Sequence, residues 1–192
     1  MVASIFLASA SAAQAQGPAD RFAGFHAGLA AGVSQTYFVV ETLAGGTAVE
    51  ARGVKAWGGA ISGFLGYDFA VSPSFLLGVG AELNDAGATA RFESGRDFAS
   101  ITPQWGYTLT ARAGYAVNDA LLLYGRGGYI AHRYSRATTI PAFFDDFPTW
   151  NRNFGLALGF EGRLADRVGI RLEAMHLDGT RNQLMVGVPI RF

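Results

Sequence analysis

Large apolar residues alternate with small or charged ones in several separate stretches of this chain, and this alternation limits the folds open to it. Between Phe75 and Asn84, for example, Phe, Leu, Val, Ala and Leu alternate with Leu, Gly, Gly, Glu and Asn. Because residues i and i+2 share one face of a β-strand, each stretch predicts a strand with one large apolar face. Eight such stretches are present, at residues 25–34, 60–69, 75–84, 105–115, 121–132, 153–164, 168–175 and 184–192.

The second face of these strands distinguishes a membrane fold from a soluble one. Strands of a soluble sandwich also alternate, but their water-facing side is rich in polar residues. Here that side is mostly Gly, Ala, Ser and Thr, and only 16% of the chain is charged, against about a quarter in soluble domains. Small residues fit the narrow lumen of an eight-stranded barrel. We therefore predict an all-β fold, an eight-stranded antiparallel up-and-down transmembrane β-barrel. A soluble lipocalin-like barrel would need the reverse arrangement of faces.

The connections between the predicted strands alternate in length, as in outer-membrane barrels. Short ones are expected at Ala70–Ser74, Asn118–Ala120 and Ala165–Arg167, and longer ones at Gln35–Lys55, Ala86–Pro103 and Ser135–Asn151, with a shorter fourth near Asp178–Gln183. Aromatic residues on the apolar face gather at both strand ends, which predicts two interfacial girdles. The short-turn girdle would hold Tyr67, Phe69, Phe75, Tyr115 and Phe192, and the long-loop girdle Trp57, Trp105, Tyr107 and Phe154.

The N-terminal residues have the features of an export signal. A short apolar stretch is closed by Ala13-Gln14-Ala15, the small-x-small pattern of a cleavage site. We expect residues 1–15 to be a signal peptide and residues 16–192 to form the barrel domain. A membrane helix needs about 20 apolar residues, and no segment supplies them. If this chain crosses a membrane, we therefore expect it to do so as a closed β-barrel.

Three stretches carry a resemblance to a known family. Residues 109–117 read LTARAGYAV and residues 122–129 read LLYGRGGY, and the last stretch, 154–192, includes IRLEA at 170–174 and ends in Arg191-Phe192. In order and spacing they resemble the OmpA-like, opacity-type outer-membrane porin family. The resemblance implies a Gram-negative outer membrane reached through the periplasm, with outer-membrane lipids and lipopolysaccharide as surroundings. It also implies that Phe192 is read by the barrel assembly machinery. Because the sequence ends with the predicted barrel, we expect no peptidoglycan-binding domain of the kind that larger members carry.

The alternation also directs charged side chains into the lumen. Buried charges persist when they are paired, so we expect a salt-bridge network that joins the third to the seventh predicted strand. Its members would be Glu82, Arg112, Arg126, Glu161, Arg171 and Glu173, with Asp68, Arg163 and Arg191 in a lower layer. We interpret this network as structural, a plug of the lumen. The alternative is a narrow gated path in which Arg112 exchanges between Glu82 and Glu161.

The sequence gives little support for a catalytic site or a metal site. His26 and His132 should face the lumen and His176 the lipid. Small barrels with a His-x-Ser pair near this last position act as lipid A deacylases, but here the run is His176-Leu177-Asp178, which lacks the nucleophilic hydroxyl. We expect no catalytic residues, no metal and no cofactor, and interpret Asp145-Asp146 as part of a solvated loop. The zero net charge and the lack of a Lys/Arg cluster indicate no nucleic-acid partner.

Clustered aromatic residues mark one expected external loop. Exposed aromatic clusters often form interaction surfaces, so this loop could contact a host surface, a phage or a neighbouring protein. Alternatively, its side chains pack on the barrel rim or enter the lipopolysaccharide headgroup zone. The residues are Phe143, Phe144, Phe147 and Trp150. The leading function is therefore outer-membrane integrity with display of surface loops and little or no pore activity. A small-solute channel is the alternative, and a lipid A-modifying enzyme is third.

Overall fold

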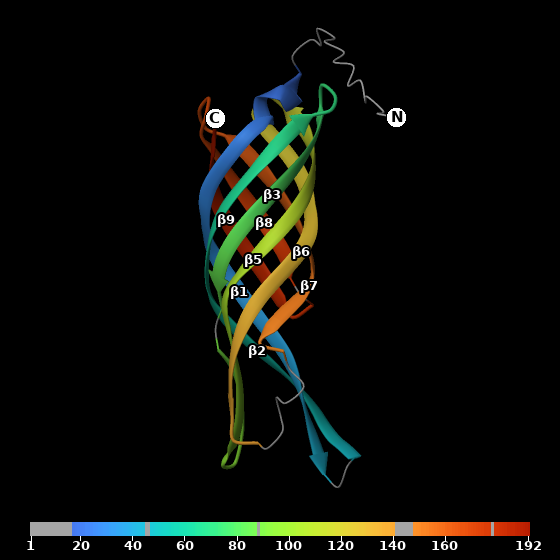
Figure 1. Ribbon diagram of the computed structural model, residues 1–192, viewed down its shortest axis with the longest axis vertical. Helices are drawn as coiled ribbons and strands as arrows, with labels where there is room; N and C mark the ends of the chain where they lie inside the picture. The colour runs from blue at the N-terminus through green and yellow to red at the C-terminus, as the bar shows by residue number, and fades with distance from the viewer. Residues whose placement is uncertain (1–16, 45–46, 88, 141–147, 178) are drawn as a thin grey trace, which may run out of the picture.

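The computed structural model describes residues 17–44, 47–87, 89–140, 148–177 and 179–192 (Figure 1). The predicted signal peptide, residues 1–15, lies outside the described residues, as do Phe143, Phe144 and Phe147 and the pair Asp145-Asp146. No helix among the described residues is both long and apolar enough to span a membrane.

The chain forms one short 3₁₀ helix and nine strands. The helix is η1 (Pro18–Phe22), and the strands are β1 (Gly24–Ala44), β2 (Thr47–Ala70), β3 (Phe75–Ala86), β4 (Ala90–Ser94), β5 (Asp97–Asn118), β6 (Leu121–Thr138), β7 (Trp150–Arg163), β8 (Gly169–Leu177) and β9 (Arg181–Arg191).

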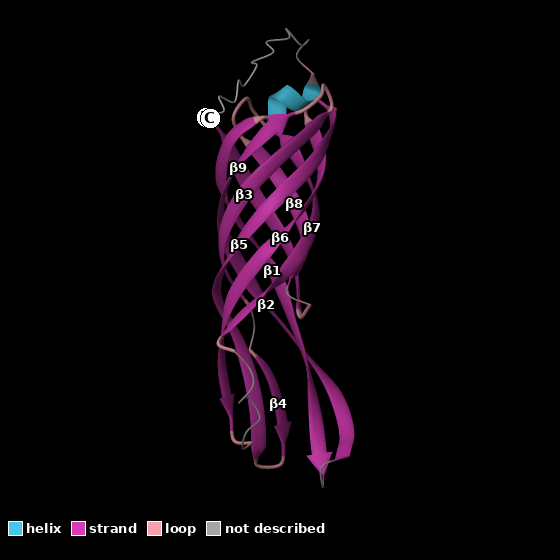
Figure 2. Ribbon diagram, turned by 45° about the vertical axis from the view of Figure 1, so that its right-hand side comes forward, coloured by secondary structure: helices cyan, strands magenta, loops and turns pink. Residues whose placement is uncertain are grey.

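Eight of these strands close into a ring of antiparallel neighbours. The sheet runs in the order β3-β2-β1-β9-β8-β7-β6-β5-β4, and a further pairing between β3 and β5 closes the ring. β4 pairs with β5 beyond this closure and stands outside the barrel wall. First and last strands meet between His26 and Arg191 at one end and Thr36 and Arg181 at the other. The prediction of an eight-stranded up-and-down barrel is confirmed (Figures 1 and 2).

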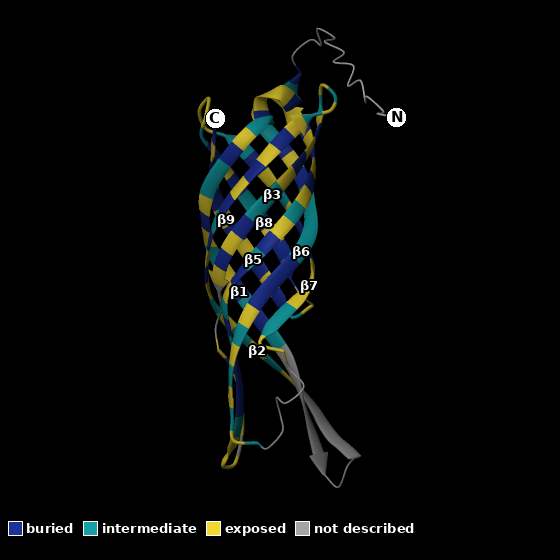
Figure 3. Cartoon of the chain, in the orientation of Figure 1, coloured by how far each residue is buried: buried dark blue, intermediate teal, exposed yellow. Residues whose placement is uncertain are grey.

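Inward and outward residues alternate along every wall strand, as the sequence predicts. Burial therefore forms a checkerboard over the wall (Figure 3). Outward Leu158 is 73% exposed and inward Glu161 only 1%. Leu109 and Leu123 also point outward. The large apolar face is the outer one, which excludes the soluble lipocalin-like arrangement.

The predicted long connections were wrong in one respect, because much of their length is strand. β1 runs to Ala44 and β2 starts at Thr47, so the segment Gln35–Lys55 is almost entirely a two-stranded ribbon. The segment Ala86–Pro103 likewise contains β4 and the start of β5, which meet at Gly95 with φ +62°. β6 continues through Ser135 to Thr138, and β9 begins at Arg181. A ribbon beyond the apolar band has no inner and outer face, so its residues need not alternate and the alternation does not predict it. The run TYFVV at 36–40 nevertheless favours a strand.

The ends of the barrel differ. At the turn end lie the connections 71–74, 119–120 and 164–168, both described chain ends and η1. The ribbons extend from the opposite, loop end (Figure 2). The sequence did not predict η1, which lies across the turn end. Ala19 and Phe22 of η1 are fully buried and pack against Leu76, Ala116, Leu122 and Tyr124. This apolar layer closes the turn end of the lumen.

Candidate functional site

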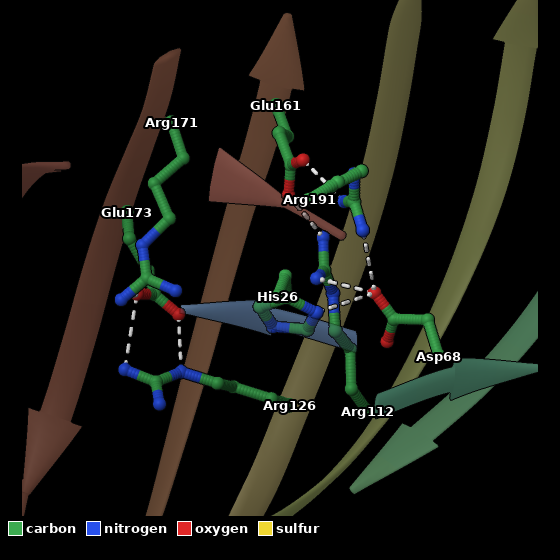
Figure 4. Close-up of polar contacts among 8 residues, drawn as sticks. All are labelled: His26, Asp68, Arg112, Arg126, Glu161, Arg171, Glu173 and Arg191. Carbon is green, nitrogen blue, oxygen red and sulfur yellow. Dashed lines mark hydrogen bonds and ion pairs between the residues drawn. The ribbon is translucent and has the colours of Figure 1, made fainter. Parts of the chain in front are cut away.

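The lumen holds two groups of paired charges, and the group nearer η1 is here named the turn-side cluster. It consists of His26, Asp68, Arg112, Glu161 and Arg191 (Figure 4). Arg112 donates to Asp68 at 3.1 Å and to Glu161 at 2.9 Å. Arg191 also donates to Glu161 and lies 3.6 Å from Asp68. His26 Nδ1 is 3.4 Å from Asp68. Two guanidinium groups and two carboxylates thus balance each other in charge.

The second group, the loop-side cluster, consists of Glu82, Arg126, Arg171 and Glu173. Arg126 donates to Glu82 at 2.6 Å and to both carboxylate oxygens of Glu173. Arg171 lies 3.8 Å from Glu82 and 3.6 Å from Glu173. This cluster also contains two guanidinium groups and two carboxylates. Buried ions cost little net free energy when their charges are matched and their hydrogen bonds are made.

Strand register explains why the charges divide into two clusters. Arg112 in β5 and Arg126 in β6 are direct cross-strand neighbours, and like charges so placed repel each other. Their side chains accordingly reach different carboxylates across the lumen. Within the described residues, no ion pair joins the turn-side cluster to the loop-side cluster.

All six residues predicted for the lumen network lie inside the barrel, and the structure gives their pairing, which the sequence did not assign. Arg112 contacts Asp68 and Glu161, whereas Glu82 is held by Arg126 and Arg171. The network also reaches the first, second and last strands through His26, Asp68 and Arg191. The sequence predicts that all three face the lumen, but their partners could not be assigned because these depend on how the ring closes.

Arg163 does not belong to either cluster. Its guanidinium donates to the backbone carbonyls of Asp119 and Asp166 and lies 3.7 Å from the exposed Asp166 carboxylate. It therefore ties together two turns at the turn end. The predicted lower layer of Asp68, Arg163 and Arg191 was wrong, since Asp68 and Arg191 are part of the turn-side cluster.

Aromatic rings and apolar side chains cover the two clusters on the turn side and on the loop side. The Arg112 guanidinium carbon lies 3.9 Å from the ring centre of Tyr124, and that of Arg171 lies 3.4 Å from the ring centre of Phe64. Such stacking stabilises a desolvated cation. Tyr124 belongs to the η1 layer. Phe64 belongs to a second apolar layer toward the loop end, formed by Ala30, Ala60, Phe64, Ile130, Ala157, Met175, Leu177 and Met185.

The lumen leaves little open space at the level of the clusters. A cavity of about 20 Å³ lies among His26, Asp68, Arg112 and Arg126, room for roughly one water molecule. Beyond the second apolar layer, Arg181 contacts His132 at 3.0 Å and Gln183 donates to Ser34 at 3.4 Å. Apolar and polar layers therefore alternate along the lumen, from η1 to the loop end.

The three histidines lie on the faces that the sequence predicts. His26 and His132 are buried in the lumen, and His176 is exposed on the outer wall, where Nδ1 is 2.8 Å from the Asn182 amide oxygen. Within the described part of the chain, no group of three or more His, Asp or Glu residues is arranged to hold a metal ion.

Aromatic residues form a belt at each end of the wall. At the turn end, Tyr67 packs on Phe69 and Phe75 packs on Tyr115, with ring centres 4.6 and 5.0 Å apart. Phe192, the predicted assembly signal, is exposed, and its ring centre is 5.7 Å from that of Phe25.

The belt at the loop end includes Trp150, which belongs to the predicted group of loop aromatics. It opens β7, and its ring centre is 5.1 Å from that of Trp105 and 6.4 Å from that of Tyr107. Trp150 therefore packs on the barrel rim, the alternative that the sequence left open.

Comparisons with known proteins agree with this architecture. The family model for an outer membrane protein β-barrel domain matches residues 2–192. The fold is similar to that of Neisserial surface protein A, with 9% identity, a TM-score of 0.50 and coverage of 88% of this chain and 97% of that one. Ail, the attachment invasion locus protein of Yersinia pestis, matches with 15% identity, a TM-score of 0.43 and coverage of 88% and 99%. No curated protein matches the chain.

Proposed function

The chain belongs to the family of outer-membrane β-barrel domains, and we propose that it is a closed member that supports outer-membrane integrity and displays external ribbons and loops. Family membership places it in the bacterial outer membrane. The turn end then faces the periplasm, where outer-membrane barrels have their short turns, and the ribbons extend outside the cell. The proposed barrel has little or no pore activity and no catalytic role.

One observation carries the proposal, namely the filling of the lumen along its length. The η1 layer, two balanced charge clusters and the second apolar layer follow one another between the barrel ends. A solute would have to separate ion pairs whose carboxylates are almost completely buried. Removing one partner of a buried ion pair costs about 3–5 kcal/mol, so spontaneous opening is rare.

Planar-bilayer recording tests the closed state. We expect no discrete conductance steps from the wild-type barrel. A variant lacking residues 17–22 should also stay silent, because both charge clusters remain. Discrete steps in the wild type that change in Arg112→Ala would instead support the small-solute channel.

A genetic experiment separates the two parts of the proposed function. A strain without this protein should become more sensitive to bile salts and bulky antibiotics. Wild-type protein and a variant lacking residues 142–147 should both restore resistance, since the deletion leaves Trp150 and the wall intact. Surface adhesion should return with the wild type alone. Unchanged sensitivity of the deletion strain would contradict the integrity role, and equal adhesion by both proteins would contradict contact through Phe143, Phe144 and Phe147.

A further inference from the structure

The outer wall of β5, β6 and β7 carries a connected group of aromatic rings at the loop end. Besides the contacts of Trp150 with Trp105 and Tyr107, Tyr107 lies 6.3 Å from Tyr129, and Tyr129 lies 6.4 Å from Phe154, measured between ring centres. Such rings favour the boundary between hydrocarbon and headgroups. Ala131, on the outward register among them, is only 1% exposed, so the rings form a continuous surface.

Two arginines stand on this aromatic surface. Arg133 of β6 is the cross-strand partner of Trp150, and Arg152 of β7 is the partner of Ala131. The two residues therefore occupy diagonal positions on the same outward face, and both are exposed. Diagonal neighbours of this kind lie about 7–8 Å apart at their Cα atoms, so one anionic group can contact both side chains.

Neither arginine has a carboxylate partner within ion-pair distance in the part of the chain that the structure describes. The lumen arginines of both clusters, by contrast, are matched by carboxylates. The outward residues nearest the loop end of β1, β3 and β9 are Gln35, Asp85 and Asn182. Unmatched positive charge thus gathers on the β6–β7 sector of the rim.

The height of this sector on the wall matches that of lipid headgroups. Outward residues of β7 and its turn run from Phe154 to Leu164 without a charge. Ten residues at about 3.4 Å each, tilted by about 45°, span roughly 24 Å, close to the usual apolar band of outer-membrane barrels. Arg152 is the next outward residue beyond Phe154 and so lies just outside the hydrocarbon. Arg133 lies beside it.

We propose that Arg133 and Arg152 bind a phosphate group of lipopolysaccharide in the outer leaflet, with the aromatic surface packed against its acyl chains and sugars. The assignment rests on the proposed function, which places this end of the barrel outside the cell. Guanidinium groups suit the task because their planar donors bond phosphate oxygens in pairs and keep their charge. The ligand class is a phosphorylated glycolipid.

Binding of lipid A to the refolded full barrel in zwitterionic detergent tests the assignment. Two of the three tryptophans, Trp105 and Trp150, lie in the sector, so intrinsic fluorescence reports the titration. Diphosphorylated lipid A should bind wild type about 30-fold more tightly than Arg133→Gln/Arg152→Gln, since each juxtamembrane cation contributes roughly a fivefold gain. Dephosphorylated lipid A should bind both proteins equally weakly.

The control removes two arginines elsewhere. Arg96→Gln/Arg167→Gln takes the same charge from an external turn and from the turn end, and should bind like wild type. Equal affinity of wild type for phosphorylated and dephosphorylated lipid A overturns the proposal without needing any variant. Displacement by millimolar inorganic phosphate overturns the lipid assignment. Neither result alters the conductance test, so failure of the closed-barrel function is recognised separately.

Discussion

Replacing Arg126 by methionine is expected to lower the free energy of unfolding by about 3–5 kcal/mol, the cost of breaking a buried ion pair on one side. Arg126 holds both Glu82 and Glu173, whose side chains are 2% and 0% exposed. Without it these carboxylates share Arg171, at 3.8 and 3.6 Å. Urea unfolding in lipid vesicles, followed by tryptophan fluorescence and by the gel shift of the folded barrel, measures the loss.

A double variant tests whether the stability depends on charge balance or on the number of contacts. Arg126→Met/Glu173→Met leaves one guanidinium and one carboxylate in the loop-side cluster, and it should be more stable than Arg126→Met alone. A double variant less stable than the single one would contradict the charge-balance account. Arg163→Met is the matched control. Its ion partner is fully exposed and its removal leaves no buried carboxylate unpaired, so a clearly smaller loss than that of Arg126→Met is expected.

Replacing Gly128 by valine should prevent most of the chain from reaching the folded barrel. A Cβ atom at this position would lie 2.7 Å from the Cα of Thr110 and still closer to the carbonyl oxygen of Leu109. Both are backbone atoms of the paired strand β5, so relief requires disruption of the strand ladder. Overpacking costs about 1–3 kcal/mol where side chains can yield, and more is expected here. The fraction refolded in vesicles measures the effect.

Gly59→Val is the matched control for this substitution. Gly59 lies on β2, faces outward, and a Cβ atom there would have no neighbour within 4 Å. Valine favours strands, so the folded fraction should equal or exceed that of wild type. Equal refolding of Gly128→Val and wild type would show that the wall yields at this point, contrary to the register described.

The sequence predicts the wall well because each strand carries its own inside–outside contrast. A shift of one residue would turn every side chain to the wrong face, so Leu158 and Glu161 can be assigned without knowledge of any other strand. Pairing inside the lumen is different. Whether Arg112 reaches Glu82 or Glu161 depends on the register of several strands, and on Arg126 standing opposite it. Local sequence patterns hold no information on which side chains meet across the lumen.

Two further features could not be predicted because they also depend on contacts between strands: the burial of η1 and the proximity of Arg133 to Arg152. The Gly17-Pro18 start and Asp20, whose carboxylate accepts from the Gly17 amide at 2.8 Å, favour a short helical turn. The burial of Phe22 in the barrel mouth, however, follows from closure of the ring. Arg133 and Arg152 are separated by 18 residues of chain and become neighbours through the β6–β7 register.

The composition of the turn-side cluster has a consequence for assembly. Its residues come from β1, β2, β5, β7 and β9, so its full set of ion pairs, which includes Arg191 with Asp68, cannot form until the first and last strands meet. An open sheet would expose Arg191 and Asp68 to hydrocarbon, where unmatched polar groups are costly. Slippage of the closing β1–β9 pair by two residues would displace Arg191 by roughly 7 Å relative to Asp68 of β2, although Glu161 of β7, on the same side of the seam, would move with it. The buried charges thus act as a proofreading element, since the complete set of ion pairs in the turn-side cluster forms only in the correct closed register.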